Sequence, residues 1–368
     1  MMDFGRVAFV GNCQIAAMWL LYTRVLPREL AGQAVYIPAY NAATPESRRA
    51  IAEADRVVWQ LTEFAQELGN VESSAPRFLV PLCICPFLWP YAGDAHPRNV
   101  ALPCLPDGPY PGEFGDSFLN QLIDSGTEPD AAAQRYLALD VARIRSVGRM
   151  AEIALDQQRR RDRACGYDVA GVIDRLLARQ PLFRSRGHLN PPIMRHLAET
   201  LFARMGADAE FMRYVATTRY DDLVPYSEIP VHPSVAAHFG LAYVAPDTRY
   251  QFFYEGGFTF AEWAARYIRC NWNQDFAQAM HLAQMGNTDL AIPLWEQSMA
   301  QSPRSSIGRA SLAEVMVQSG RAGHAVRWIR DAAQLEPDNA DYARRSREIT
   351  AQASHEAATA TAADKQAN

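Results

Sequence analysis

Up to about residue 90, short apolar runs alternate with helical stretches, and this alternation constrains the fold more than any other feature. The runs are continuously apolar rather than alternating, which is typical of a parallel sheet covered by helices on both faces. The sequence therefore predicts an α/β core with a parallel sheet in its N-terminal part. The expected strands are Val7–Val10, Ala34–Ala39, Arg56–Leu61 and Arg77–Cys85, and the expected helices are Gln14–Val25, Pro45–Ala54 and a short one near Glu63–Leu68.

The first expected strand runs into the turn Gly11–Asn12–Cys13–Gln14 and then into an apolar-faced helix. Because ligands of parallel sheets bind beyond the carboxyl ends of the strands, Cys13 is expected at the edge where a site would form. The N–H groups and the positive dipole end of a helix start favour the thiolate, the reactive form of cysteine. Gly11 allows the tight turn, and Asn12 and Gln14 offer amide donors for an oxyanion. The alternative is a small buried cysteine that only fills the turn.

A nucleophilic cysteine needs a base, which histidine usually supplies. His96 follows the fourth expected strand, so it is expected on the same sheet edge as Cys13, with Asp94 as a residue that can orient it. His188 directly precedes an expected helix that begins at Pro191. For each histidine the alternative is a side chain that only packs within its loop.

Arginines gather around residue 150 and again beside His188. Carboxylates lie between those of the first group, so a solvated helix face with ion pairs is the usual explanation. The alternative is a site for the phosphates of a ligand, which guanidinium groups bind through paired hydrogen bonds. No glycine-rich dinucleotide motif or Walker loop occurs, so nucleotide binding of those kinds is not expected. The candidate phosphate ligands are Arg159, Arg160, Arg184 and Arg186.

Composition excludes several classes of protein. A chain of 368 residues exceeds the usual size of a single core, so two domains are expected. The formal net charge of −5 gives no reason to expect nucleic acid as a partner. Six cysteines without framework or zinc-knuckle spacing indicate a reducing compartment, no disulfides and no structural metal. No long apolar span or basic leader is present, so a cytoplasmic protein without a transmembrane segment is expected.

The C-terminal part contains a repeat with an offset of 34 residues. It resembles the tetratricopeptide repeat, in which two helices are joined by a Gly turn and the second is ended by Pro. Two such units and a trailing helix over Tyr342–Ala351 are fewer than a free solenoid needs, so they are expected to dock on the main domain or bind another chain. The recurring pairs are Gly286 and Gly320, Ala291 and Ala325, Leu294 and Trp328, and Pro303 and Pro337.

Three segments are therefore expected. Residues 1–260 form the α/β domain with its helical additions, and residues 274–351 form the tetratricopeptide-like helices. Residues 354–368 form an Ala/Thr-rich tail without aliphatic anchors, which is expected to be disordered.

The chain resembles the WcbI-type polysaccharide-biosynthesis proteins of bacterial capsule clusters. The resemblance covers roughly residues 5–245 and follows four stretches in order. Two departures are visible: Arg98 stands where an acid is expected after His96–Pro97, and Leu189–Asn190 separate His188 from Pro191. The four stretches are Gly11–Gln14, the Pro- and aromatic-rich block ending in His96–Pro97, Gly115–Asn120, and Tyr167–Val169 leading to Phe183 and His188.

The resemblance implies a coenzyme A-binding protein that acetylates capsule sugars, with Cys13 as the catalytic thiol and His188 or His96 as its partner. The turn is also similar, more remotely, to that of SGNH-type esterases, which have Ser in place of Cys13 but also a late Asp-x-x-His pair that is missing here. The leading hypothesis is a coenzyme A-dependent O-acyltransferase acting on a sugar or polysaccharide precursor. The N-terminal core is expected to be SGNH-like or flavodoxin-like. The alternatives for function are a thiol hydrolase or esterase of SGNH-like architecture, and a non-catalytic coenzyme A-binding or scaffold protein that recruits glycan-assembly enzymes through its repeats.

Overall fold

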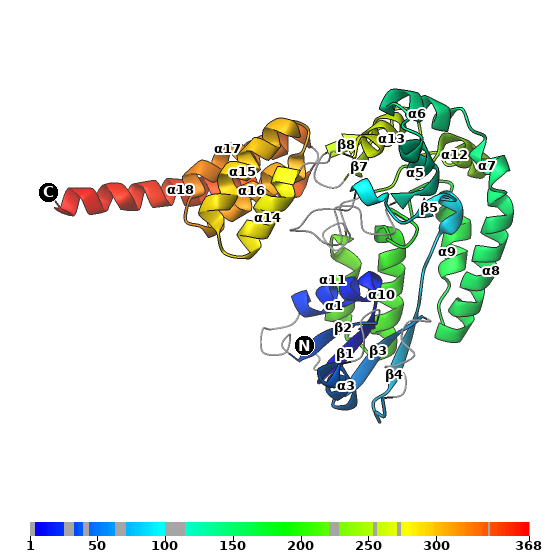
Figure 1. Cartoon of the computed structure of the whole chain (residues 1–368). Coiled ribbons are helices and arrows are strands. Elements are labelled where there is room, and N and C mark those ends of the chain that lie inside the picture. The colour runs from blue at the N-terminus through cyan, green and yellow to red at the C-terminus, as the bar shows by residue number, and fades with distance from the viewer. Residues whose placement is uncertain are drawn as a thin grey trace. The chain divides into compact units, whose positions relative to one another are not determined.

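Four parallel strands form the sheet in the N-terminal part of the chain, in the order β2-β1-β3-β4 (Figure 1). The central strand β1 (Val7–Gly11) is buried along its whole length. Its neighbours are β2 (Ala34–Pro38) and β3 (Arg56–Leu61), and β4 (Arg77–Pro81) pairs with β3. The expected parallel sheet is therefore confirmed.

A computed structural model describes residues 4–25, 33–39, 44–62, 71–99, 115–220, 228–252, 256–270, 274–337 and 339–367. The expected helix near Glu63–Leu68 and the cysteine at Cys104 lie outside these ranges.

The chain forms two compact units. The first comprises Met1–Pro90, Asp140–Pro225 and Val231–Ala245, and the second comprises Tyr91–Leu139, Tyr226–Pro230 and Pro246–Asn368. The boundaries of these units differ from the expected segments, residues 1–260 and 274–351. The expected segments stay a prediction about parts of the chain that can fold separately.

Helices cover both faces of the sheet, as the continuously apolar strands predict (Figure 1). On one face, Ile51 of α3 (Pro45–Ala52) packs with Ala8 and Val10 of β1. On the other face, Phe9 contacts Tyr22 of α1 (Cys13–Val25), with ring centroids 5.4 Å apart. Adjacent residues of β1 thus point to opposite faces, and both faces are apolar.

The face with α1 is completed by two helices from much later in the chain. Phe202 of α10 (Pro191–Met205) and Phe211 of α11 (Ala209–Thr217) have ring centroids 4.9 Å apart. Both rings also contact Tyr22, at 6.0 and 6.1 Å. The packing of these three rings fixes the C-terminal helices of the first unit on its sheet.

The expected strand over Arg77–Cys85 is too long, because β4 ends at Pro81. Beyond this point the chain leaves the sheet, and the backbone N–H of Cys85 donates to the carbonyl of Arg186 at 2.8 Å. A short 3-10 helix, η2 (Pro86–Leu88), follows.

The long helical pattern over Pro129–Arg163 is three helices: α6 (Pro129–Leu137), α7 (Val141–Ile144) and α8 (Val147–Cys165). Asp140 starts α7 by accepting a hydrogen bond from the N–H of Arg143. Ser146 then adopts a left-handed backbone conformation, φ 50°, which interrupts the helix before α8. The first unit also contains α9 (Val169–Leu176) and α12 (Pro233–Phe239).

The second unit begins with two short antiparallel pairs and three helices. The strand β5 (Ala92–Gly93) pairs with β6 (Gly115–Asp116), and β7 (Tyr250–Phe252) pairs with β8 (Gly256–Phe258). Tyr136 of α6 packs on Phe260, the first residue of α13. The remaining elements here are the 3-10 helix η3 (Pro97–Asn99), α5 (Ser117–Asp124) and α13 (Phe260–Arg269).

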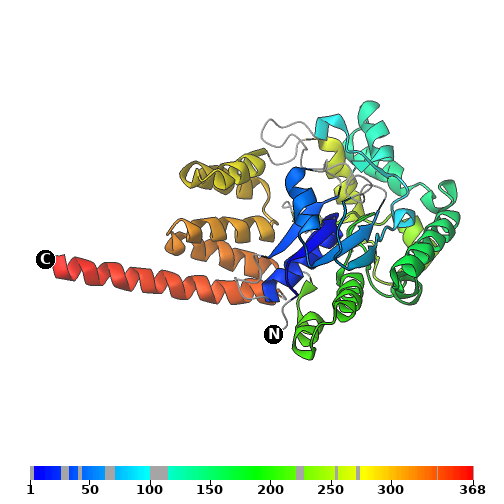
Figure 2. The ribbon, with the colours of Figure 1, turned by 90° about the horizontal axis from the view of Figure 1, so that it is seen from below.

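The rest of the second unit is helical, and its first four helices form two hairpins of the same construction (Figure 2). Gly286 and Gly320 end the first helix of each hairpin with φ of 79° and 73°, a conformation that favours glycine. Small residues at equivalent positions, Ala279 and Ala313, are fully buried. The tetratricopeptide resemblance stays a prediction. The helices are α14 (Gln274–Gln284), α15 (Thr288–Gln301), α16 (Ser306–Gln318), α17 (Ala322–Leu335) and α18 (Ala340–Ala367).

The structure continues α18 to Ala367, and the disorder expected from Ser354 onward stays a prediction. Alanine has the highest intrinsic helix propensity, so an Ala-rich segment can extend a helix without burying an apolar face. Within the described parts of the chain, no helix is long and apolar enough to span a bilayer.

The three packed rings make a direct test of the core of the first unit. Replacing Phe202 by Ala should lower the free energy of unfolding by about 3–5 kcal/mol, because a large buried ring is lost and a cavity remains. Urea denaturation followed by tryptophan fluorescence measures the difference. Arg163→Ala, at an exposed position of α8, should change it by about 0.5 kcal/mol or less. Equal effects of the two substitutions would contradict this packing.

Candidate functional site

Cys13 is the first residue of α1, directly after the turn that ends β1. Its side chain is exposed, whereas Cys83, Cys85 and Cys165 are buried. Burial raises the pKa of the Cys83 and Cys85 thiols well above the ordinary value and that of Cys165 to about 11. Among the described cysteines, Cys13 is therefore the thiol best placed to react. The alternative of a buried cysteine filling the turn is wrong.

Asn12 caps the helix that presents this thiol. Its carbonyl accepts the N–H groups of Ile15 and Ala16 at 2.9 and 3.0 Å, and its side-chain oxygen accepts the N–H of Gln14 at 2.9 Å. Its side-chain nitrogen makes no hydrogen bond to the residues that the structure describes. Asn12 therefore keeps a side-chain donor in the turn that carries Cys13, and its use for an oxyanion stays a prediction.

Gly11 is required by close packing rather than by an unusual backbone angle. A Cβ atom here would lie 2.4 Å from Cγ1 of Ile15 and 2.9 Å from Cβ of Gln60. No other residue fits between β3 and the first turn of α1 without a shift. The carbonyl of Gly11 accepts the N–H of Ala39 at 2.9 Å and the hydroxyl of Tyr36 at 3.2 Å, which fixes the end of β1.

Gln14 has a different role from the oxyanion donor expected from the sequence. Its side chain is buried, and its amide nitrogen donates to the carbonyls of Cys83 at 2.7 Å and Gly187 at 2.8 Å. Both amide hydrogens are thus engaged, and none remains for an oxyanion. Gln14 instead joins the Cys13 turn to the loop that precedes α10.

That loop carries His188. It is closed by a bridge between Phe183 and Leu189, and the N–H of Arg184 donates to the carbonyl of His188 at 2.9 Å. Ser185 lies 2.8 Å from Nδ1 of His188 and fixes the ring. His188 directly follows Gly187, the residue bound by Gln14, so the structure brings the loop of His188 to the Cys13 turn.

His96 belongs to the second unit, and both of its ring nitrogens are engaged. Nδ1 accepts the backbone N–H of Arg98 at 3.1 Å, so the proton is assigned to Nε2, which lies 3.0 Å from the carboxylate of Asp124. The expectation that Asp94 orients His96 is wrong, because Asp124 on α5 takes that place. These bonds give His96 a structural role in fixing its loop.

The arginines separate into two groups. Arg159 pairs with Asp174 at 2.9 Å and Arg160 pairs with Asp156 at 2.7 Å, both on the exposed surface of α8. This agrees with a solvated helix face. Arg186 is exposed in the His188 loop and forms no ion pair with the described carboxylates. Of the expected phosphate ligands, Arg186 is therefore the best placed, and Arg184 lies two residues before it.

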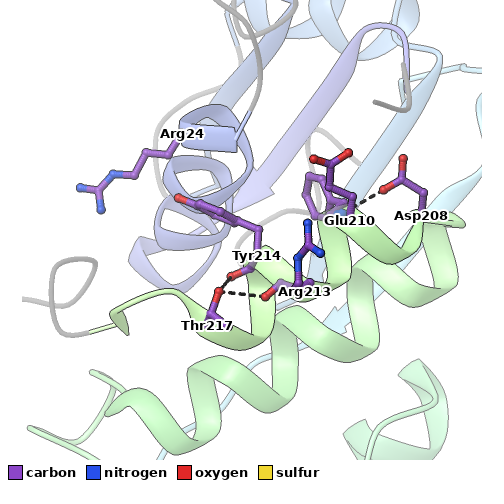
Figure 3. Close-up of a pocket in the computed structure, with 7 residues that line it drawn as sticks. Arg24, Asp208, Glu210, Arg213, Tyr214 and Thr217 are labelled. Carbon is purple, nitrogen blue, oxygen red and sulfur yellow. Dashed lines mark hydrogen bonds between the residues drawn. The ribbon is translucent and has the colours of Figure 1, made fainter.

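A pocket of about 400 Å³ lies at the other end of α1 (Figure 3). Because α1 has thirteen residues, Cys13 and this pocket are separated by roughly 20 Å along the helix. The pocket is thus distinct from the thiol edge, and no sequence motif indicated it. Its lining residues are Arg24, Asp208, Glu210, Phe211, Arg213, Tyr214 and Thr217.

Asp116, within one of the family-like stretches, is the buried carboxylate of the second unit. One oxygen caps α5 by accepting the N–H groups of Phe118 and Leu119, each at 2.9 Å. The other accepts the hydroxyl of Tyr136 at 2.6 Å. Burial raises the pKa of Asp116 to about 6, against the lowering effect of these hydrogen bonds. The stretch therefore organises α5.

The raised pKa gives a dependence of stability on pH. The unfolded chain loses the Asp116 proton near pH 3.8, whereas the folded chain keeps it to about pH 6. Stability should therefore fall as pH rises through this window, by on the order of 3 kcal/mol, and this contribution should then stay level. Thermal unfolding of the full chain at a series of pH values measures it. Asp116→Asn should remove this part of the profile, and an identical profile in both proteins would contradict the assignment.

The fold and the site together define a class: an α/β protein whose first strand presents an exposed thiol at a helix start on the carboxyl edge of a parallel sheet. The family model of the polysaccharide biosynthesis enzyme WcbI matches residues 6–210. This match spans more than half of the chain, which therefore belongs to the WcbI family of polysaccharide biosynthesis enzymes. The family expected from the sequence is confirmed.

A solved structure of WcbI, described as a novel polysaccharide biosynthesis enzyme, is similar in fold. It aligns with a TM-score of 0.51 and 14% identity, over 79% of this chain and 98% of that chain. That structure is of the native protein without a disulfide bond between coenzyme A and one of its cysteines. At this identity the likeness concerns the fold alone. No curated protein matches the chain.

Proposed function

We propose that this protein transfers an acyl group, acetyl in the simplest case, from coenzyme A to a hydroxyl of a sugar or polysaccharide precursor. The observation that carries the proposal is the exposed Cys13 at the start of α1, with the His188 loop hydrogen-bonded to the next residue, Gln14. The family supports a polysaccharide precursor as substrate, and the similar WcbI structure supports coenzyme A.

In the first step the Cys13 sulfur attacks the thioester carbonyl carbon, and His188 accepts the thiol proton. The carbonyl oxygen becomes an oxyanion, to which the Asn12 amide nitrogen donates. One such donor typically contributes on the order of 3 kcal/mol to the transition state. The bond to the coenzyme A sulfur then breaks, and that sulfur leaves with the proton from His188.

In the second step the sugar hydroxyl attacks the acyl-cysteine carbonyl. His188 accepts the hydroxyl proton and returns it to the Cys13 sulfur as the ester forms. Direct transfer uses the same residues: His188 accepts the hydroxyl proton while the sugar oxygen attacks a thioester held beside Cys13. The bond to the coenzyme A sulfur then breaks, and that sulfur leaves with the proton from His188. If water replaces the sugar, the same chemistry is hydrolysis.

The free thiols of this chemistry fit a reducing compartment such as the cytoplasm. We assign the C-terminal repeat region, residues 274–351, which comprises the two hairpins and the first part of α18, to binding a protein partner. Met285 and Leu290, at the tip of the first hairpin, are 67% and 62% exposed and supply apolar surface that a partner could cover.

The transferase proposal is tested with acetyl-CoA and sugar acceptors. Release of free coenzyme A thiol by the wild type should fall at least about a hundredfold in Cys13→Ala and in His188→Ala, the usual scale for loss of a nucleophile or base. Mass spectrometry of the protein without acceptor separates the two routes, because only the two-step route leaves an acetyl group on Cys13. Equal rates in all three proteins would remove these residues from the chemistry. Release that continues over many turnovers without acceptor would indicate a hydrolase, because acylation of Cys13 alone frees only one thiol per protein.

The role of Arg186 is tested by the affinity for coenzyme A. Arg186→Ala should weaken binding about tenfold or more, because a charge-assisted hydrogen bond contributes on the order of 1.5 kcal/mol. Arg160→Ala, which removes only a surface ion pair on α8, should leave affinity within about a factor of two. Calorimetric titration measures both, and the opposite ranking would move the phosphate site to α8.

A further inference from the structure

Two buried glutamines lie beneath the Cys13 turn. Gln14 is 3% exposed, and Gln60, near the end of β3, is fully buried. The amide nitrogen of Gln60 donates to the side-chain oxygen of Gln14 at 3.0 Å. The side-chain oxygen of Gln60 accepts the backbone N–H of Asn12 at 2.9 Å. Neither residue is needed for packing alone, since an apolar side chain fills a core without hydrogen bonds to satisfy.

The directions of these hydrogen bonds follow from one another. A backbone N–H only donates, so the N–H of Asn12 requires the oxygen of Gln60 to face it. The Gln60 nitrogen then faces Gln14 and requires an oxygen there. The Gln14 nitrogen is thereby left to donate to the two carbonyls, of Cys83 and Gly187.

The Gln14 oxygen accepts a second bond, from the N–H of Cys83 at 3.2 Å. All the donors and acceptors of this amide are therefore satisfied, which makes it a rigid connection in a buried site. It joins three segments that are distant in the sequence: the Cys13 turn, the chain leaving β4 at Cys83, and the loop ending at Gly187.

We propose that Gln14 and Gln60 are positioning residues, a pair that holds His188 in register with the Cys13 thiol. Both side chains are buried beneath the Cys13 turn, so they contact no substrate. This inference rests on the proposed function in one respect, the use of His188 as the base for Cys13.

An isosteric substitution at Gln14 removes the two hydrogen bonds that its nitrogen donates and leaves its other hydrogen bonds in place. Gln14→Glu places a carboxylate oxygen against the carbonyls of Cys83 and Gly187, so both donated bonds are lost. The other oxygen still accepts from Gln60 and from the N–H of Cys83. Gln158→Glu on α8 is a matched control, because Gln158 is also buried and donates to Asp162 at 3.0 Å but has no bond to the turn.

The test is a double-mutant cycle on the reactivity of Cys13 toward iodoacetamide, quantified at that residue by mass spectrometry. At pH 7, Gln14→Glu and His188→Ala should each lower the alkylation rate about tenfold, within the range of coupling inside one network. The double variant should react no more slowly than His188→Ala, because Gln14 acts through His188. Gln158→Glu should keep the wild-type rate.

The proposal is overturned if Gln14→Glu or His188→Ala reacts like the wild type, if the two effects multiply, or if Gln158→Glu slows alkylation equally. If Gln14→Glu does not fold, Gln60→Glu replaces it, since it keeps the bond to Asn12 and loses only the one to Gln14. Acyl transfer is measured separately. A wild type that releases no thiol from acetyl-CoA contradicts the transferase, whereas the alkylation cycle alone decides the positioning role.

Discussion

The close approach of the first turn of α1 to β3 at Gly11 is the constraint on which the rest of the site depends. With no side chain at this position, the first turn of α1 lies directly against β3, and Ile15 and Gln60 occupy the space that a Cβ would need. A larger residue would push the helix start away from the sheet. The helix start would then no longer hold the Cys13 thiol and Asn12 in place above the buried side chains of Gln14 and Gln60.

Burial of polar groups follows from the same constraint. Asn12 has a backbone N–H that points toward β3, and only a polar side chain on that strand can satisfy it. Gln60 does so, directly after the buried apolar residues Val57, Val58 and Trp59 of the same strand. Its own nitrogen then requires a partner, which Gln14 supplies. A polar residue in a buried strand therefore indicates a neighbouring buried polar group that needs a hydrogen-bond partner.

Much of the core and the position of Cys13 could be predicted from the sequence, because they depend on local patterns. Continuous apolar runs gave the four parallel strands, and the Gly-led turn placed the thiol at a helix start. The roles of Gln14 and Asp94 could not be predicted, because they depend on partners far along the chain: Gly187 for Gln14, and Asp124 in place of Asp94 for His96. Gln60 was missed for the same reason, although a glutamine amid apolar strand residues was a visible signal.

The two units interleave along the sequence, since each is assembled from separate segments. In the second unit, the hydroxyl of Tyr267 on α13 accepts the N–H of His96 and donates to Asn120. A gene shortened to its first 260 codons would therefore remove a helix that the loop around His96 and the start of α5 require. Expression of the chain without its C-terminal hairpins has to retain residues through Arg269, even though the family match ends near residue 210.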